Sequence, residues 1–335
     1  MRALVVATSY PESPADPSGH FVASEVQQLL RRGYRVTLVV PQGSTTRSAT
    51  PGIQLREIPA GDAFGFPGVR ARLQHPSPLT RARRALGVVA FMALARREIA
   101  RLVRAQGAFD LVQAHWLLPG AFPLLPHGIA REAERVAHGG EVRLLLALAP
   151  RMAKTVLEHA TRAAAVTRLR AVSGQLLEAL APLTPKSIVD RRVEPCAIDL
   201  SGVPSRADAR RLHEVEGELW LIVARLIASK RIDVALKKSL EFARPSAVVV
   251  IGDGPLRQAL EAEFPHARFL GQLPRPECLS WLAAADGLLS ASLLEGAPTV
   301  IREARALGVR VLSAPAGDLR HWAERDPGLE LFTDP

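Results

Sequence analysis

Short runs of apolar residues alternate with longer mixed segments along almost the whole chain. Runs of this length that end in turn residues are typical of buried parallel strands. Strands are predicted at 2–8, 34–40, 53–58, 110–115, 168–173, 219–224, 247–251, 268–270, 287–290 and 310–313. Because helical stretches separate these runs, the pattern predicts an α/β protein with parallel sheets.

The strands fall into two series, one in each half of the chain. A chain of 335 residues can hold two domains of ordinary size, each with its own core. The segment Pro195–Leu200 gives way to Ser201–Arg206, which is rich in turn residues. We therefore expect two Rossmann-like domains, residues 1–200 and residues 201–335.

The composition, with 48% hydrophobic and 23% charged residues, is that of a soluble globular protein. No apolar run approaches the length of about 18 residues that a membrane-spanning helix needs, and residues 1–8 form a strand pattern, not a leader peptide. Cys196 and Cys278 match no metal or redox spacing. We expect them to be reduced thiols in a cytoplasmic protein.

The formal charge of +10 is concentrated in one part of the chain. Residues 1–180 contain 23 Lys and Arg against 12 Asp and Glu, whereas residues 181–335 contain 20 against 21. An excess of this kind predicts an anionic partner such as a membrane surface, with compositional drift as the alternative. No nucleic-acid recognition motif accompanies the charge, so nucleic acid is not expected.

Two segments of the first half allow more than one interpretation. Residues 79–106 carry seven arginines around an apolar centre, which fits either a basic interfacial helix or a core-packed helix with a basic outer face. Residues 41–80 are rich in Gly, Pro and Ser and predict a long loop excursion.

The most informative segment of the chain places two glutamates, Glu295 and Glu303, around a turn and a helix start. Pro298 suits the first position of that helix, because its φ is already helical and its missing N–H would have no partner there. The free N–H groups of about residues 299–301 favour a phosphate. Carboxylates beside a phosphate site are explained if they bind hydroxyl groups, such as those of a sugar and a ribose.

The pattern E-G-x-P-x-x-x-x-E-A resembles the retaining, nucleotide-sugar-dependent glycosyltransferases of family 4, which have the GT-B fold. The resemblance implies that Glu303 binds the donor ribose and that Glu295 lies beside the transferred sugar. It also implies that Pro298, Thr299 and Val300 form the donor-binding helix start. It extends over nearly the whole chain and is strong over residues 219–320.

Arg225 and Lys230 follow strand 219–224 at its carboxyl end, where ligands bind in open α/β sheets. An arginine and a lysine together can neutralise a diphosphate. The run resembles the family's G-R-L-x-x-x-K-G, which clamps the donor pyrophosphate, but Ala224 and Arg231 replace the two glycines.

Two further turns of the second half resemble family turns. Gly252-Asp253-Gly254-Pro255 resembles a G-D/E-G-P turn, which we expect to be mainly architectural. Leu273 lies in the loop after the next strand, so the resemblance makes it a candidate nucleobase contact.

In the first half, Gly19 precedes a helix start and resembles the family's substrate-facing glycine. His138-Gly139-Gly140-Glu141 resembles the motif H-G-x-D, whose histidine lies beside the reacting sugar. The segment before this motif, residues 130–137, is polar and helix-prone, whereas the family has a strand there. His115 is a second candidate for the same crevice, although we expect His115, His20 and His127 to be packed or solvated.

The resemblance implies an enzyme that moves a sugar from a nucleoside-diphosphate sugar to an acceptor hydroxyl with retention, with His138 and Glu295 as catalytic residues. No Asp-x-Asp motif occurs at the expected loops, so we expect neither metal nor cofactor, and Arg225, Lys230 and the helix start must stabilise the departing diphosphate. We expect a lipid-linked or polysaccharide acceptor and attachment to the inner face of the cell membrane.

Two alternatives remain on the same fold: a catalytically inactive GT-B binding subunit and a nucleotide-sugar epimerase. The motif departures favour the first of these. The resemblance also implies two parallel sheets that face a central cleft, and because the sequence ends at Pro335 we expect the C-terminal helices to be short or missing.

Overall fold

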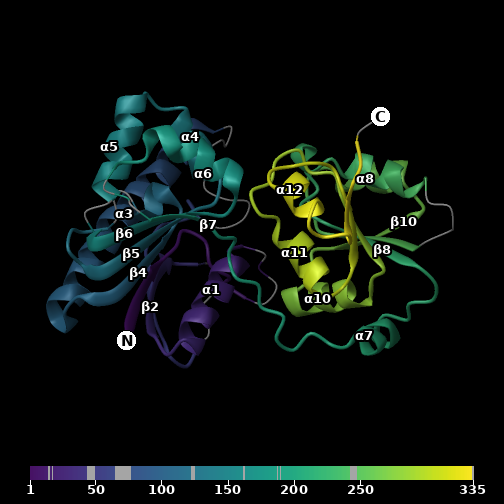
Figure 1. Cartoon of the computed structure of the whole chain (residues 1–335), viewed down its shortest axis with the longest axis horizontal. Helices are drawn as coiled ribbons and strands as arrows, with labels where there is room; N and C mark the ends of the chain where they lie inside the picture. Colours follow the sequence, from purple (N-terminus) through teal and green to yellow (C-terminus); the bar gives the residue numbers. More distant parts are fainter. Residues whose placement is uncertain are drawn as a thin grey trace. The chain divides into compact units, whose positions relative to one another are not determined.

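The computed structural model describes residues 1–13, 16, 18–43, 50–64, 77–121, 125–160, 163–186, 188, 190–241 and 247–333 (Figure 1). The chain forms two compact units, Met1–Ala197 and Ile198–Pro335. The division therefore falls after Ala197, whereas the sequence predicts a boundary after residue 200.

The first unit is built on a seven-stranded sheet with the order β3-β2-β1-β4-β5-β6-β7, and its neighbouring strands pair in parallel. The order reverses between β1 and β4, which makes a topological switch point. The strands are β1 (Arg2–Val6), β2 (Arg35–Pro41), β3 (Ile53–Ile58), β4 (Phe109–His115), β5 (Ala130–Ala137), β6 (Ala164–Ala171) and β7 (Asp190–Val193).

Helices cover both faces of this sheet (Figure 1). Apolar residues of α1 pack against β1 and β2 on one face, and those of α3 pack on the other, where α4, α5 and α6 extend the layer over β5 and β6. The helices are α1 (His20–Arg31), α3 (Pro78–Gln106), α4 (Gly140–Leu146), α5 (Pro150–Ala160) and α6 (Gly174–Leu180), with short turns at Leu117–Ala121 and Ala181–Leu183.

The second unit has a six-stranded parallel sheet with the order β10-β9-β8-β11-β12-β13. The order reverses between β8 and β11, and the whole arrangement is that of a Rossmann fold. Its strands are β8 (Leu219–Val223), β9 (Ala247–Ile251), β10 (Ala267–Gly271), β11 (Gly287–Ser290), β12 (Arg310–Ser313) and β13 (Leu329–Leu331).

The helices of the second unit also divide between the two faces of the sheet. Residues of α7, α10, α11 and α12 belong to one core cluster, and residues of α8 and α9 belong to the other. Their bounds are α7 (Arg206–Leu212), α8 (Ile232–Ser239), α9 (Arg257–Glu263), α10 (Arg275–Ala284), α11 (Thr299–Ala306) and α12 (Leu319–Ala323), with a short turn at Ala228–Lys230.

All ten predicted strands are present, although β6 begins four residues before the predicted strand at 168. The prediction for residues 130–137 is wrong, because this segment is the interior strand β5. Its two glutamates are paired across the sheet: Glu132 with Arg168, and Glu134 with Arg170. Such cross-strand pairs stabilise a strand whose composition is otherwise typical of a helix.

Three further outcomes concern individual segments. Helix α3 is core-packed with a basic outer face, because Phe91, Ala95 and Ile99 are fully buried. Strands β7 and β13 were not predicted; both are short, and β7 is largely exposed. The predicted excursion at 41–80 contains β3, and much of the remainder lies outside the described residues.

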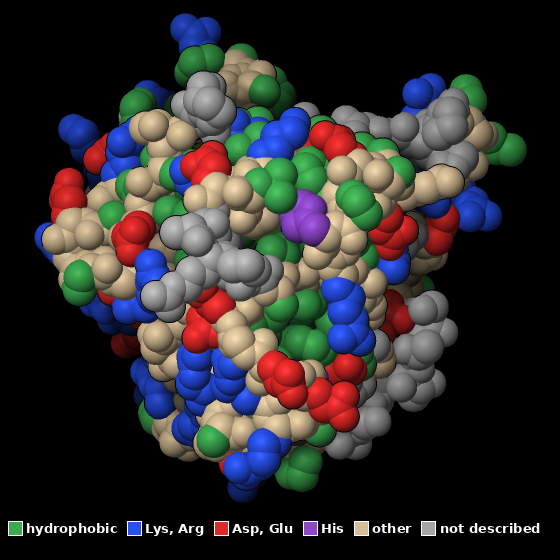
Figure 2. Space-filling model, turned by 90° about the vertical axis from the view of Figure 1, so that its right-hand side faces the viewer, with side chains coloured by type: hydrophobic (Ala, Val, Ile, Leu, Met, Phe, Trp, Pro, Cys, Tyr) green, Lys and Arg blue, Asp and Glu red, His purple; other side chains and the backbone are tan. Residues whose placement is uncertain are grey.

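The described helices and the surface charge give two further properties of the chain. No helix in the described part of the chain combines the length and the apolar character needed to cross a membrane. Positive and negative side chains are intermixed on the face shown in Figure 2, as expected from the near balance of charge in residues 181–335.

Candidate functional site

The predicted site residues lie beyond the carboxyl ends of strands in both units. Gly19 lies in the connection after β1, and His138 directly follows β5. In the second unit, Arg225 and Lys230 follow β8, and Glu295 follows β11. The residues after β1, β8 and β11 are therefore at the two switch points, where open parallel sheets bind ligands.

Helix α11 begins at Thr299 with Pro298 as its N-cap, one residue later than predicted, and no side chain caps it. The N–H groups of Thr299, Val300 and Ile301 belong to the first turn, which has no intrahelical acceptors for them. This helix start can therefore donate hydrogen bonds to an anion.

The structure brings Lys230 and Glu295 together: the Lys230 Nζ atom contacts Glu295 Oε1 in a partly buried ion pair. Backbone contacts hold the two loops beside each other, because Leu293 donates to the carbonyl of Ser229 at 3.0 Å. The predicted phosphate-binding lysine and the predicted sugar-side glutamate thus belong to one site, at the β8–β11 switch point.

Glu303 lies in the second turn of α11 and is only 4% exposed. Its Oε1 atom accepts a hydrogen bond of 2.6 Å from Nη2 of Arg275, which also reaches the carbonyl of Asp199 at 3.4 Å. Burial raises the pKa of Glu303, although the charge of Arg275 opposes this shift. Arg275 was not predicted; its position at the start of α10, just after the β10 loop, is the feature of the sequence that could have identified it.

The loop that carries Arg225 is held by the turn after β9. Gly252 has φ +137°, and a Cβ there would lie 1.9 Å from the carbonyl oxygen of Ala224. A Cβ on Gly254 would lie 2.4 Å from the carbonyl oxygen of Leu226. Both glycines are therefore needed because the turn after β9 and the loop after β8 pack backbone against backbone. This agrees with the prediction that the turn is mainly architectural.

The two other substrate-binding predictions in loops have different surroundings. Gly19 is the N-cap of α1 with φ 67°, and a Cβ there would lie 2.3 Å from the carbonyl oxygen of Ser9, so the backbone alone requires glycine. Leu273 is partly buried and packs against the core cluster of α10 and α11.

His138 lies between β5 and α4, where Gly139 has φ 114°. Glu141 fixes this turn, because its Oε1 atom accepts a 2.7 Å hydrogen bond from the backbone N–H of His138. Aromatic rings surround the imidazole: the ring centroids of Phe21 and Trp116 each lie 4.8 Å from that of His138.

The structure also joins His115 to His138, as Nδ1 of His115 lies 3.0 Å from Nε2 of His138. The Nε2 atom of His115 lies 3.2 Å from Oε1 of Gln113. His115 is thus packed, as expected, but within the site. Gln113 was not identified from the sequence; a polar residue inside the apolar run of β4 is the feature that could have indicated it.

A buried ion pair lies behind Gln113. Arg170 of β6 donates to both carboxylate oxygens of Glu25 on α1, at 2.7 and 3.0 Å, and to Glu134 of β5 at 3.2 Å. Glu25 also accepts a hydrogen bond from the backbone N–H of Ala197. The pair therefore anchors the segment that ends the first unit.

The electrostatics of this region follow from burial. Burial and the charge of Arg170 lower the pKa of His115 to about 3. Burial, His115 and Arg170 lower the pKa of His138 well below its usual value. Burial alone would raise the pKa of Glu25, but its contacts with Arg170 more than offset this, so its pKa is lowered. Both histidines are neutral at pH 7, and Glu25 is ionised.

Among the described residues, His115, His138 and Cys196 form the group that could approach a metal ion, with ligand atoms within 4.8 Å of one another. The 3.0 Å separation of the two ring nitrogens is a hydrogen-bond length, so a proton is shared there. A metal ion would have to displace that proton. The geometry fits a hydrogen-bonded pair better than a metal site.

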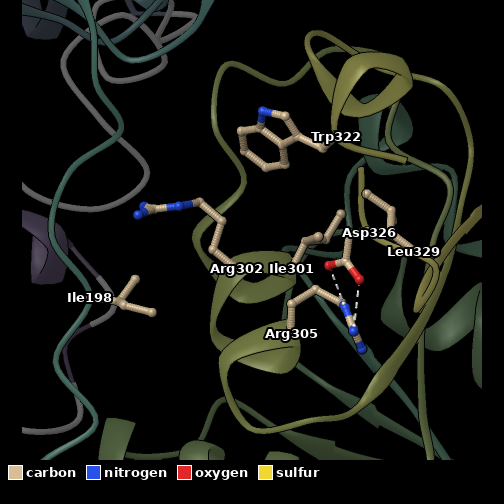
Figure 3. Close-up of a pocket in the computed structure, with 7 residues that line it drawn as sticks. All are labelled: Ile198, Ile301, Arg302, Arg305, Trp322, Asp326 and Leu329. Carbon is tan, nitrogen blue, oxygen red and sulfur yellow. Dashed lines mark hydrogen bonds and ion pairs between the residues drawn. The ribbon is translucent and has the colours of Figure 1, made fainter. Parts of the chain in front are cut away.

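A cavity of about 270 Å³ lies on α11, beside the candidate donor site (Figure 3). Arg305 lines it and forms a two-pronged pair with Asp326, with N–O distances of 2.7 and 2.8 Å. Arg302 points away from this pair in Figure 3. The remaining lining residues are Ile198, Ile301, Trp322 and Leu329.

Comparison with known proteins identifies the second unit at the level of sequence. Residues 217–332 match the family model of glycosyl transferases group 1. The chain is also 26% identical over 340 residues to TuaC of Bacillus subtilis (strain 168), a proposed glycosyltransferase of teichuronic acid biosynthesis, with 95% of this chain and 82% of TuaC covered.

Solved structures share the fold of the whole chain. Sucrose-phosphate synthase from Thermosynechococcus elongatus has a TM-score of 0.73 at 16% identity, and Anabaena HepE, solved with UDP and glucose, has a TM-score of 0.64 at 17% identity. Each match covers 100% of this chain and 86% of the other. The chain therefore has the GT-B fold of two Rossmann-like domains, and its second unit is similar in sequence to the glycosyl transferases of group 1.

Proposed function

We propose that the chain transfers a sugar from a nucleoside-diphosphate sugar to an acceptor hydroxyl with retention of configuration. The observation that carries this proposal is the site at the β8–β11 switch point. There Lys230, after β8, pairs with Glu295, which lies in the loop that leads to the uncapped start of α11. A pyrophosphate and a sugar need these two kinds of group side by side.

The donor would be held by the second unit. Arg225, Lys230 and the N–H groups of Thr299 and Val300 would bind the pyrophosphate, and Pro298 sets the start of that helix. The buried carboxylate of Glu303 suits ribose hydroxyl groups, because it has a second oxygen besides the one that Arg275 occupies. Leu273 would contact the nucleobase.

The first unit would supply the residues on the acceptor side. Gly19 permits close approach of substrate to the backbone at the start of α1, and His138 would contact the transferred sugar. In the second unit, Glu295 would be the residue beside the transferred sugar. In this arrangement His138 and Glu295 are the catalytic residues.

The leaving group would be stabilised by electrostatics. As the bond between the anomeric carbon and the diphosphate oxygen breaks, negative charge develops on the diphosphate, and Arg225, Lys230 and the α11 start would oppose it. The acceptor oxygen would form its bond on the same face of the sugar. Its proton would pass to a phosphate oxygen of the leaving group, which gives retention without an enzymic nucleophile.

The acceptor we propose is a lipid-linked sugar or a growing surface polysaccharide. TuaC, the curated relative, is a proposed enzyme of teichuronic acid biosynthesis, and HepE has been solved with UDP and with UDP-glucose. The basic first unit fits an acceptor on the anionic inner face of the cell membrane.

A thermal-shift panel of UDP-, GDP- and ADP-sugars tests donor binding, because a bound ligand raises the melting temperature by mass action. One nucleotide class should raise it. In Arg225→Ala and Lys230→Ala, affinity for the nucleoside diphosphate should fall far more than affinity for the nucleoside. Equal losses for both ligands, or no shift with any donor, would contradict the assignment.

Transfer should also continue in EDTA, because Arg225, Lys230 and the start of α11 would neutralise the negative charge of the leaving group without a metal ion. The measurement is sugar release from the identified donor before and after chelation. If chelation abolishes transfer and Mg²⁺ or Mn²⁺ restores it, the metal-independent mechanism is wrong.

A further inference from the structure

The buried side chains behind His138 form a hydrogen-bonded series in which each proton can be assigned. It begins at Gln113, whose Nε2 atom lies 3.1 Å from Oε2 of Glu25 and 2.8 Å from Oε2 of Glu134. Carboxylate oxygens accept hydrogen bonds and the amide NH₂ group donates them. The opposite orientation of the amide would place its oxygen against two carboxylates, so the orientation of Gln113 is fixed.

The orientation of Gln113 fixes the proton of His115. The Oε1 atom of Gln113 lies 3.2 Å from Nε2 of His115 and can only accept. His115 is fully buried and neutral, so it has one ring proton, and this proton must be on Nε2. The Nδ1 atom of His115 is therefore left with a lone pair.

The proton of His138 is fixed in turn by His115. Nδ1 of His115 lies 3.0 Å from Nε2 of His138, so Nε2 of His138 must donate. The neutral ring of His138 has no second proton, and its Nδ1 atom carries a lone pair. The neighbour of that atom is the sulfur of Cys196 at 4.0 Å, a long and weak contact.

We propose that Glu25, Glu134 and Gln113, acting through His115, hold His138 in the tautomer that is protonated on Nε2, so that Nδ1 accepts a hydrogen bond from a substrate hydroxyl. Glu25, Glu134, Gln113 and His115 are positioning residues. His138 is the residue that touches substrate, an assignment that rests on the proposed function. In this tautomer His138 can accept a proton but cannot donate one from Nδ1.

The surrounding groups support a fixed tautomer. Arg170 lies against Glu25 and Glu134 and opposes protonation of both histidines, whereas the charge of Glu25 favours protonation of His138. The rings of Phe21 and Trp116 pack beside the imidazole of His138 and restrict its rotation. A hydroxyl that donates to Nδ1 would form a stronger bond than the thiol of Cys196 does.

The consequence is selectivity at one position of the sugar. A hydroxyl at the position that faces His138 can donate to Nδ1, whereas a fluorine or a hydrogen there cannot. Loss of one such hydrogen bond corresponds to about a tenfold loss in transfer. A donor analogue with fluorine at that position should therefore be transferred about tenfold more slowly than the parent sugar.

The ring protons can be observed directly by NMR on the full chain labelled with ¹⁵N-histidine. His138 and His115 should both show a protonated Nε2 and a bare Nδ1, and neither should titrate between pH 5 and 8. His138→Gln and His115→Asn identify the signals. A protonated Nδ1 in either ring would overturn the proposal.

Two variants of His115 test whether the effect passes through this residue. In Asn the Oδ1 atom occupies the place of Nδ1 and can still accept from His138, whereas Leu cannot. His115→Leu should give a mixture of His138 tautomers and about a tenfold lower kcat. His115→Asn should keep the single His138 tautomer and a kcat close to that of the wild type. An unchanged His138 tautomer in His115→Leu would overturn the role of His115.

His213→Leu is the control, because His213, which is partly buried in the second unit, also stacks on a ring, that of Trp281. It should change neither the tautomer of His138 nor kcat. The tautomer is measured without donor, so the two proposals can fail separately. If the tautomer is as stated but His138→Gln leaves transfer unchanged, the catalytic role of His138 is wrong and the hydrogen-bonded series stands.

Discussion

Glu303 shows how a single buried carboxylate can serve a ligand. It is almost fully buried, and its pKa is raised by that burial, yet one of its oxygens is held by Arg275. Glu303→Ala should weaken binding of the nucleotide by about 1–3 kcal/mol, because the ribose hydroxyls lose their acceptor. Isothermal titration with the identified nucleotide measures the change.

Glu324→Ala is the control for this variant, because Glu324 is an exposed glutamate at the C-cap of α12 in the same unit. It should leave the affinity unchanged. Unaltered nucleotide binding in a folded Glu303→Ala protein would remove the ribose assignment.

Glu141 makes the stability of the first unit depend on pH. Burial raises its pKa from 4.5 to about 7, although backbone N–H groups oppose this shift. Between these two values the folded chain holds a proton that the unfolded chain has lost, so stability falls as the pH rises through this window. The fall is on the order of 3 kcal/mol and ends above the folded pKa.

Denaturant unfolding of the wild type and of Glu141→Gln at several pH values measures this contribution. The difference in unfolding free energy between the two proteins should change steadily from about pH 4.5 to 7 and then become constant. A difference that is independent of pH would show that Glu141 is ionised throughout.

Arg135 is fully buried on β5, and its three guanidinium nitrogens have no hydrogen-bond partner among the described residues. Burial lowers its pKa to about 10. A buried charge without a partner destabilises the fold. Arg135→Met should therefore raise the unfolding free energy by about 1–3 kcal/mol, with Arg131→Met on the exposed part of the same strand as the control. A destabilised Arg135→Met protein would show that this arginine has a partner.

Among the structural elements, the turn after β9 has the strictest backbone requirement in the described part of the second unit. Gly252→Ala would place a Cβ 1.9 Å from the Ala224 carbonyl oxygen, at φ +137°. We expect a loss of more than about 2 kcal/mol in the unfolding free energy of this unit. The fluorescence of Trp220, Trp281 and Trp322 in denaturant follows the transition, because all three lie in this unit.

Gly217→Ala separates conformational strain from steric overlap. Gly217 also has a positive φ, +73°, but a Cβ there would meet nothing within 4 Å. This variant should cost only about 1 kcal/mol. Equal losses for the two variants would mean that the contact with Ala224 is not tight.

For the whole molecule, the excess of basic residues in the first unit can be assigned to particular helices on its surface. On α4 and α5, the exposed apolar residues Leu144, Leu146 and Met152 lie among Arg143, Arg151 and Lys154, which are also exposed. Exposed apolar and basic side chains together favour an anionic lipid surface. We propose this patch, together with the arginines of α3, as the membrane-binding surface.

The chain should sediment with anionic vesicles at low salt, dissociate at high salt and ignore neutral vesicles. Leu144→Glu with Leu146→Glu should abolish sedimentation, because the apolar contact is lost and negative charge is added. Leu212→Glu in the second unit, where Leu212 is 66% exposed, is the matched control. Binding that does not depend on lipid charge would favour compositional drift as the origin of the asymmetry.

The sequence was sufficient for the architecture because the apolar runs of parallel strands are local features. Ten of the strands, the two Rossmann-like series, the loops that carry Arg225, Lys230 and Glu295, and the helix that carries Glu303 were predictable in this way. Sheet topology then requires these loops to lie at carboxyl ends, so the pairing of Lys230 with Glu295 follows from position in the fold.

Tertiary structure decided the features that depend on partners distant in sequence. Residues 130–137 form a strand because Arg168 and Arg170 of β6 neutralise their glutamates across the sheet. The environment of His138 depends on Gln113, 25 residues away, and on Glu25 on another helix. Arg275 meets Glu303 because α10 and α11 pack together on one face of the sheet. Local pattern specifies the elements, whereas the protonation and pairing of buried groups are set by the packing that brings those elements together.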